Sequence, residues 1–506
     1  MNPLDQHRTP YFDALQDYVR AGTIPFHTPG HKQGKGMHAR LRDFVGDNVP
    51  AIDLTQIRGL DDLNQPEGPI QDAHELAAAA YGANFSYFLV NGSTAGNQAM
   101  LMAALRPGDS VLLPRNSHKS ATSALIMSAT TPVYMPPEVD ADLHIDHCVS
   151  AETVSAALRS NPAVKAVFIT SPTYYGATAD LIAIEKIVHE HGKLLLVDEA
   201  WGPHLHFHAE LPPSATASGA DVCVNSTHKL LAGMSQASML HTTGARIEQG
   251  RLRSTLRLFQ STSPSLVLLA SLDVARMQMA TEGERLLTRT LQLARDARAQ
   301  LNALPGIYCM GPDHVGRPGV AGYDETRIVI TVKNLGYTGY EAEEILRMRS
   351  NVQVELADLF NVVALITIGD SEESVARLIA AVSELAHARR SLETNAPSAV
   401  LSERLRSANY ALPPIPEQVA TPREAFLSDH VEIPLSESAG KVCAEVVTPY
   451  PPGIPILCPG ERITKEIIEY LRLELGAGSH MQGPVDTKLR TIRVLQNPTV
   501  HEVTTF

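Results

Sequence analysis

Short apolar runs and longer stretches of helical spacing alternate between residues 71 and 270. Apolar residues are nearly continuous in four short runs, which predict strands at 86–90, 110–114, 166–170 and 193–200. Apolar residues at helical spacing predict helices at 71–82, 94–105 and 181–192. Buried strands separated by helices are typical of a parallel sheet covered on both faces. The pattern therefore predicts an α/β domain of about 250 residues.

The remainder of the chain predicts two further parts. Residues 265–304 have long helical spacing. Beyond them, apolar runs at 327–332 and 362–369, together with helices near 340–350 and at 374–390, indicate a smaller α+β domain. The segment 391–420, rich in Pro, Ser, Asn and Ala, is interpreted as a linker, and a β-rich unit containing the loop 448–461 comes after it. We place the domains at 1–275, 276–392 and 393–506.

Composition narrows the class of protein. The chain has 506 residues, 44 % apolar and 19 % charged, which is ordinary for a globular protein and excludes a disordered or collagen-like chain. Its net charge of −13 argues against nucleic-acid binding, which depends on Lys and Arg contacting phosphates. Five widely spaced cysteines without a C-x-x-C motif suggest no disulfide framework. With no signal-peptide pattern and no long apolar run, we expect a cytoplasmic protein without membrane contact.

Three segments carry candidate chemistry. In VNGSTAGNQ (90–98), a turn precedes a helix, so Ser93, Thr94 and free N–H groups could bind a phosphate, although the same residues would also cap an ordinary helix. In LLLVDEAWG (194–202), Asp198 ends an apolar strand, where it could pair with a ring nitrogen, bind a metal or cap a helix. In ADVCVNSTHKLLAG (220–233), Lys229 follows a strand and could be a Schiff-base nucleophile or a surface lysine.

The order of these segments is that of pyridoxal-phosphate (PLP) enzymes with the aspartate-aminotransferase fold. Further motifs sharpen the resemblance: FHTPGHKQG (26–34), GLDDLNQPEGPI (59–70), RNSHKS (115–120), TSPTYYG (170–176), VDEAWGPHLHFH (197–208), STHK (226–229), QSTSPS (260–265), TPYPPGIP and CPGE. The chain resembles the bacterial ornithine/lysine/arginine decarboxylase family over nearly its whole length. The resemblance implies an α/β type I PLP fold, with a large parallel or mixed sheet, a small α+β domain and a C-terminal α+β domain.

The resemblance also implies residue roles. Lys229 should form the Schiff base with PLP, Asp198 should keep the pyridine nitrogen protonated, and Lys229 or His228 should reprotonate the substrate Cα. Ala200 and His118 should lie against the two faces of the ring. The phosphate should be held by Ser93, Thr94, Ser226 and His228, although Ala95 replaces a hydroxyl residue expected in many relatives. Ser261, Thr262 and Ser263 should reach the cofactor of the partner subunit in a homodimer, or in a dimer of dimers.

Two other signals are given ordinary interpretations. His204, His206 and His208 alternate like residues on one face of a strand, but no Cys or paired-carboxylate pattern accompanies them, so we expect no metal. The segment GHKQGKG (30–36) is basic and rich in glycine, yet it does not match the nucleotide-binding loop G-x-x-x-x-G-K-[ST].

The expected reaction is decarboxylation of a cationic amino acid, with arginine converted to agmatine for polyamine synthesis favoured over lysine or ornithine. The short form without the N-terminal wing of the acid-stress members resembles the biosynthetic arginine enzymes. Candidate substrate residues are Thr28, His31, Asp62, Glu67, Trp201 and Glu461, with Asp61 more an ordinary turn residue and Asp53 a weaker candidate. Two alternatives stay open, namely an aminotransferase of the same fold and a non-catalytic cofactor-binding regulator.

Overall fold

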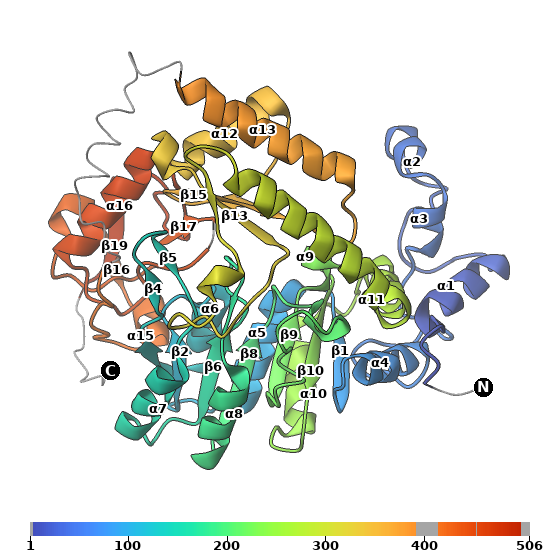
Figure 1. Ribbon diagram of the computed structural model, residues 1–506. Coiled ribbons are helices and arrows are strands. Elements are labelled where there is room, and N and C mark those ends of the chain that lie inside the picture. The colour runs from blue at the N-terminus through green and yellow to red at the C-terminus, as the bar shows by residue number, and fades with distance from the viewer. Residues whose placement is uncertain (1–3, 391–412, 452, 497–506) are drawn as a thin grey trace. The chain divides into compact units, whose positions relative to one another are not determined.

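The computed structural model describes residues 4–390, 413–451 and 453–496 (Figure 1). The chain forms two compact units, each made of two separate stretches. The first unit comprises Met1–Ala104 and Leu194–Leu287, and the second comprises Leu105–Lys193 and Thr288–Phe506. The domain boundaries expected at 275 and 392 do not coincide with these units and stay a prediction. Within the described ranges, none of the helices has the length and apolarity needed to cross a bilayer.

The first unit contains four neighbouring strands in the order β1-β10-β9-β8, which are β1 (Phe85–Leu89), β10 (Ser238–Thr242), β9 (Val222–Asn225) and β8 (Leu194–Asp198). Strands β8 and β9 are parallel, whereas β10 runs antiparallel to both of its neighbours. The sheet is therefore mixed, as the resemblance allowed, and the apolar pattern alone, which indicated a parallel sheet, did not predict β10. The connection from β9 to β10 contains only the four-residue helix α9 (Thr227–Leu230), which is too short for a parallel crossover.

Helices pack on these strands, and the N-terminus of α5 (Gly92–Ala104) lies beside the end of β9. The helices of this unit are α1 (Pro10–Arg20), α2 (Ala39–Val45), α3 (Asn48–Ile52), α4 (Pro69–Ala80), α5, η1 (Leu205–Phe207), α9, α10 (Gln249–Phe259) and the first part of α11 (Leu266–Asn302). Gly96 lets α5 approach β9 closely, because a Cβ atom at this position would lie 2.4 Å from Cγ2 of Val224. The close approach fixes the N-terminus of α5 beside the end of β9.

The second unit begins with three parallel strands in the order β6-β2-β3, which are β6 (Ala166–Thr170), β2 (Ser110–Pro114) and β3 (Thr131–Met135). Strand β2 leads through α6 (Lys119–Ser128) to β3, and β3 leads through the hairpin of β4 (Val139–Asp140) and β5 (Ile145–Asp146) and through α7 (Ala151–Ser160) to β6. Helix α8 (Leu181–Glu190) follows β6. Helices α7 and α8 pack side by side below these strands in Figure 1. The helical crossovers agree with the expected α/β pattern.

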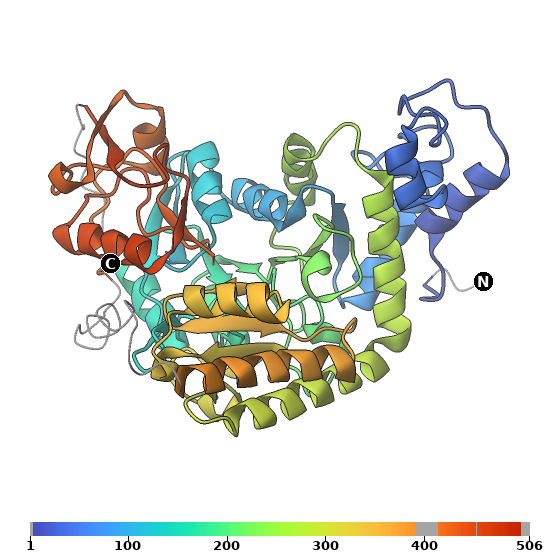
Figure 2. The same cartoon turned by 90° about the horizontal axis from the view of Figure 1, so that it is seen from above.

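The same unit contains a smaller α+β layer, as expected. Its four antiparallel strands lie in the order β11 (Tyr308–Cys309), β13 (Arg327–Thr331), β15 (Asn361–Leu365) and β14 (Leu356–Ala357). Helices α12 (Gly339–Ser350) and α13 (Glu372–Arg390) run along this sheet (Figure 2) and share an apolar core with it and with the end of α11. Short elements complete the layer, namely β7 (Ala177–Thr178), β12 (Gly322–Tyr323), η2 (Pro312–His314) and η3 (Lys333–Leu335).

The C-terminal part has helices as well as strands. Its elements are α15 (Pro422–Leu427), β16 (His430–Pro434), η4 (Leu435–Glu437), β17 (Thr448–Tyr450), α16 (Lys465–Ala477), β18 (His480–Gln482) and β19 (Thr491–Leu495). Strand β16 pairs with β19, β17 pairs with β18, and α16 supplies much of the apolar core. Most of the expected linker, residues 391–412, lies outside the described residues.

Candidate active site

Asp198 ends strand β8 and is almost fully buried. Its Oδ2 accepts a hydrogen bond of 2.7 Å from Nδ2 of Asn97 in α5, and its Oδ1 accepts one of 3.1 Å from the backbone N–H of Ala200. Burial raises the pKa of the Asp198 carboxyl, while the charge of Lys229 and the two hydrogen bonds oppose that rise. The site therefore contains a carboxylate in an apolar setting that is stabilised by specific donors.

Lys229 lies in the short helix α9, directly after strand β9. Its Nζ atom lies 3.8 Å from the centroid of the Trp201 ring, which is a cation–π contact. Trp201 follows Asp198 by three residues and is itself buried. The ends of β8 and β9 thus place a lysine, an aromatic ring and a buried carboxylate in one region of the first unit.

Two hydroxyl groups meet at the start of α5. Ser226, the last residue before α9, donates from Oγ to Oγ of Ser93 over 2.8 Å, and its backbone N–H donates to the Ala200 carbonyl oxygen over 3.3 Å. Gly92 begins α5 with a φ of +71°, a conformation that favours glycine. Thr94 is exposed at the same helix N-terminus. Hydroxyls at a helix N-terminus suit a phosphate group.

These residues fit a phosphorylated pyridine aldehyde. The carboxylate suits a protonated ring nitrogen, the lysine suits an aldehyde, and the hydroxyl pair with the N-terminus of α5 suits a phosphate. The structure brings together Ser93, Asp198, Trp201, Ser226 and Lys229 in the first unit. The predicted cluster of site residues therefore has a common location.

The two predicted histidines are held differently. Nδ1 of His228 lies 2.9 Å from the carbonyl oxygen of Ala237, and burial lowers the pKa of its imidazole, with Lys229 lowering it further. His118 belongs to the second unit, where its Nδ1 accepts a hydrogen bond from the Ser120 backbone N–H at the start of α6. The position of His118 over the cofactor ring stays a prediction.

Both local and long-range hydrogen bonds hold the segments expected near the active site. Ser261 accepts a hydrogen bond of 3.0 Å from the Ser263 backbone N–H, and Gln56 donates to the carbonyl oxygen of Thr262 over 3.3 Å. His31 lies 3.1 Å from Asp53 through Nε2, and its Nδ1 accepts from the Gly34 backbone N–H. Residues 261–263 are all exposed, which agrees with contact with a partner subunit. That contact stays a prediction, and so do the substrate contacts of Thr28 and His31.

Asp61 organises the loop that contains Asp62 and Glu67. It adopts a φ of +65°, and its two oxygens accept hydrogen bonds from four backbone N–H groups between residues 62 and 70. Asp62 and Glu67 are exposed, so their carboxylates are available to a ligand. Glu67 lies on the wall of a cavity of about 600 Å³, but the described residues that line it do not include Lys229. Asp61 thus has the turn role expected for it.

Glu461 is fully buried in the second unit. Its Oε2 forms an ion pair of 3.0 Å with Arg115 and accepts a hydrogen bond of 2.6 Å from the Cys458 backbone N–H. Arg115 also donates to the carbonyl oxygens of Pro455 and Ile456, which fixes the loop before Cys458. These contacts give Glu461 a structural partner, and a contact with substrate stays a prediction.

The three alternating histidines do not lie in a strand. His204 precedes the 3₁₀ helix η1, His206 is inside it and His208 follows it, so the expectation of alternating strand residues is wrong. Nδ1 of His206 lies 3.1 Å from Oγ of Ser214, and Nε2 of His208 lies 3.8 Å from Glu284. The glycine and proline at residues 202 and 203 interrupt the extended pattern after β8.

Sequence reasoning missed the buried amides that hold the strand-end carboxylates. Asn97 binds Asp198, and Asn225 donates from Nδ2 to Oε2 of Glu199 over 3.0 Å. Burial raises the pKa of Glu199 to about 8, although Asn225 and the Ala215 N–H oppose the rise. One signal could have indicated the role of Asn97, namely that it is a polar residue on a helix face of residues 94–105 that is otherwise small and apolar.

Comparison with known proteins gives the same assignment. A family model described as "Orn/Lys/Arg decarboxylase, major domain" matches residues 9–374, and one described as its C-terminal domain matches residues 404–484. The chain belongs to the Orn/Lys/Arg decarboxylase family. It is similar to proteins named arginine decarboxylase from Bacillus subtilis (42 % identity over 97 % of this chain and 99 % of the relative) and Bacillus anthracis (42 %, 98 % and 99 %).

Solved structures show the same fold. A crystal structure of lysine decarboxylase from Francisella novicida superposes with a TM-score of 0.80, at 24 % identity over 96 % of this chain and 81 % of that chain. The expected family, the type I PLP fold and the assignment as a PLP-dependent decarboxylase are thereby confirmed.

Proposed function

We propose that this member of the Orn/Lys/Arg decarboxylase family converts L-arginine to agmatine and CO₂. The observation that carries the proposal is the 42 % identity, over nearly the full length of both chains, to Bacillus proteins named arginine decarboxylase. The similar lysine decarboxylase structure shares only 24 % identity, so it supports the fold and not the choice of substrate. The alternatives are decarboxylation of lysine or ornithine at the same site.

When bound, PLP accepts the electron pair that remains when the bond between Cα and the carboxylate breaks. Lys229 would hold the cofactor through its aldehyde, because its amine lies at the end of strand β9 beside Trp201. Asp198 keeps the proton on the pyridine nitrogen, and the hydrogen bonds from Asn97 and Ala200 limit the basicity of its carboxylate. Lys229 or His228 delivers the proton that replaces CO₂ at Cα, and the product is a primary amine.

The remaining contacts orient the cofactor. Ser93 and Ser226, which form a hydrogen bond with each other, would hold the phosphate at the N-terminus of α5 together with Thr94 and His228. The family resemblance implies that Ala200 and His118 would contact the cofactor ring. The cation–π contact between Trp201 and Lys229 supports a place for Trp201 beside the reacting amine.

The distal guanidinium of arginine requires carboxylates, because a planar guanidinium is matched best by a bidentate carboxylate. Asp62 and Glu67 are the favoured partners, since both are exposed on a loop whose conformation Asp61 fixes. Thr28 and His31 belong to the neighbouring N-terminal segment and complete the proposed substrate set. Glu461 has a weaker claim, because it already pairs with Arg115.

The test is a comparison of kcat/KM for arginine, lysine and ornithine, measured as CO₂ release. A site built for guanidinium leaves its carboxylates poorly paired with a shorter amine, so arginine should be preferred by tenfold or more, about 1.4 kcal/mol. A tenfold preference for lysine or ornithine would overturn the assignment to arginine and leave the decarboxylase family intact. Product identification then distinguishes a decarboxylase from an aminotransferase, which would release no CO₂.

We further propose a cytoplasmic homodimer, or a dimer of dimers, that serves polyamine synthesis. The exposed residues 261–263 and the family resemblance support a role at a shared active site. Five free cysteines support a reducing compartment. Light scattering tests the assembly, and an active monomer would contradict it, whereas cell fractionation tests the compartment.

A further inference from the structure

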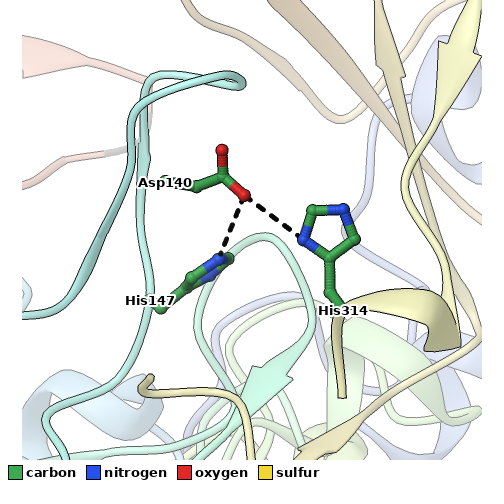
Figure 3. A group of neighbouring side chains, drawn as sticks. All are labelled: Asp140, His147 and His314. Carbon is green, nitrogen blue, oxygen red and sulfur yellow. Dashed lines mark ion pairs between the residues drawn. The ribbon is translucent and has the colours of Figure 1, made fainter. Parts of the chain in front are cut away.

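Three side chains that could ligate a metal ion, two from one hairpin and one from a distant segment, meet inside the second unit. Asp140 ends strand β4, His147 follows strand β5 of the same hairpin, and His314 ends the 3₁₀ helix η2. Figure 3 shows the carboxylate of Asp140 between the two imidazole rings. Their relative exposures are 7 %, 2 % and 2 %, so all three side chains are buried.

The spacing of the three potential ligand atoms suits a metal ion. Oδ2 of Asp140 lies 3.3 Å from Nδ1 of His314 and 3.7 Å from Nε2 of His147. All three ligand atoms lie within 4.8 Å of one another. Zinc–ligand bonds of about 2.0–2.2 Å in a tetrahedral arrangement place ligand atoms roughly 3.3–3.6 Å apart. The two distances to Asp140 are close to this range, and one face of a tetrahedral site would be complete once the two histidine nitrogens approach to the same separation.

The hydrogen bonds around His314 leave the correct nitrogen available. The Tyr308 hydroxyl donates to Asp313 over 2.8 Å, and its oxygen lies 2.8 Å from Nε2 of His314. A hydroxyl has only one proton to donate, so Nε2 carries the imidazole proton and donates it to Tyr308. Nδ1 then has a lone pair that faces Asp140. A histidine whose second nitrogen donates to an outer partner is the usual arrangement of a metal ligand.

The hydrogen bonding of Asp140 and His147 also suits metal binding. Oδ1 of Asp140 accepts hydrogen bonds of 2.9 Å from the backbone N–H groups of Asp142 and Leu143, which aim Oδ2 at the histidines. Among the described residues, neither ring nitrogen of buried His147 finds a hydrogen-bond partner. A buried imidazole without hydrogen bonds is costly unless another ligand satisfies it.

We propose that Asp140, His147 and His314 bind one divalent transition-metal ion of the zinc type, with water as a fourth ligand. Two imidazoles and a carboxylate form a ligand set that zinc accepts. The ion would cross-link the segment of η2 to the β4–β5 hairpin. Arg317 now contacts Oδ2 of Asp140 at 3.1 Å, but its side chain is 46 % exposed and can leave as the metal enters.

The alternative is a metal-free cluster in which Arg317 neutralises Asp140, and substitution of Arg317 distinguishes the two. Arg317→Gln removes a competing cation, so a metal site should bind zinc more tightly in this variant. A purely structural ion pair would lose stability in the same variant and gain no affinity for zinc.

The experiment uses the untagged, PLP-loaded full chain after dialysis against a chelator. Calorimetric titration with ZnCl₂ should give one ion per chain, and Co²⁺ should give visible absorption bands typical of a tetrahedral site. His147→Gln and His314→Gln should each weaken zinc binding at least tenfold, while His430→Gln, at an exposed histidine, should bind as the wild type does. Zinc should raise the Tm of the wild type and not that of His314→Gln.

Tyr308→Phe keeps all three ligands and tests the proposal even if a ligand variant fails to fold. Loss of this outer hydrogen bond should weaken zinc binding by about 10- to 100-fold. The proposal is overturned if zinc binds with no defined stoichiometry, or if the Tyr308 and Arg317 variants both bind zinc as the wild type does.

Discussion

Asn97 offers the sharpest test of how the site controls Asp198. Replacement by leucine keeps the approximate volume of the side chain and removes the 2.7 Å hydrogen bond to Oδ2 of Asp198. The carboxylate then retains the Ala200 N–H and the charge of Lys229 as the groups that oppose the effect of burial. Asn97→Leu should therefore make the carboxylate a stronger base.

The size of the effect depends on the strength of the lost bond. A hydrogen bond to a charged group contributes about 1.5–3 kcal/mol, and its loss should raise the pKa of Asp198 further. A more basic Asp198 attracts the proton that the pyridine nitrogen must keep. If the whole loss is expressed in the transition state, kcat should fall by about 10- to 100-fold.

The assay is the pH profile of CO₂ release from arginine, together with the absorption spectrum of the bound cofactor. The acid limb of the profile, where kcat/KM falls as the pH is lowered, should move to higher pH in Asn97→Leu. The reason is that Asp198 is then protonated at higher pH. Asn225→Ala is the matched control, since it removes an amide from the neighbouring buried carboxylate of Glu199. It should cost stability without moving the acid limb.

Two results would refute this reasoning. The first is wild-type kcat and an unchanged acid limb in Asn97→Leu, which would mean that the amide does not control Asp198. The second is an equal shift of the acid limb in Asn225→Ala, which would point to a general loosening of the strand ends instead of a specific hydrogen bond.

Three further predictions concern the cofactor, a loop and acid stability. Borohydride reduction followed by peptide mapping should place the pyridoxyl label on Lys229, and Lys229→Ala should lose activity by several orders of magnitude while keeping the fold; a label on another lysine contradicts the assignment. Asp61→Ala should remove the side-chain acceptor of four backbone N–H groups, two of them exposed to water, at a cost of at most about 1 kcal/mol each, so proteolysis within residues 62–70 should be faster than in Asp62→Ala. Burial lowers the pKa of His74 from 6.5 to about 4, and its Nε2 accepts the Phe88 N–H, so its neutral form stabilises the fold above pH 6.5 and this contribution is lost as the pH falls toward 4. Urea unfolding at pH 7 and pH 5 should show a loss from His74 of about (6.5 − 5) × 1.36, or roughly 2 kcal/mol, and His74→Phe should lack that loss.

Much of the architecture was predictable because its signals are local. Five-residue apolar strands, helices ended by glycine and the polar residue after each strand are properties of short sequence windows, and β2 and β6 have the predicted bounds. The strand β10 was not predicted, because its direction depends on the short connection through α9. The histidines that alternate like strand residues lie instead in and around the 3₁₀ helix η1, since periodicity alone does not show the turn that precedes it.

The sequence by itself determined the family, the cofactor chemistry and the order of the residues that carry it, because strand-end motifs such as those around Asp198 and Lys229 are contiguous. The tertiary structure alone decided which distant side chains meet. Asn97 reaches Asp198 across 101 positions, and Ser226 reaches Ser93 across 133. His314 comes to Asp140 from another layer of the second unit, and no spacing along the chain indicates that contact. Burial then sets the charge behaviour of these groups, because the desolvation that shifts a pKa arises from packing, which local patterns do not encode.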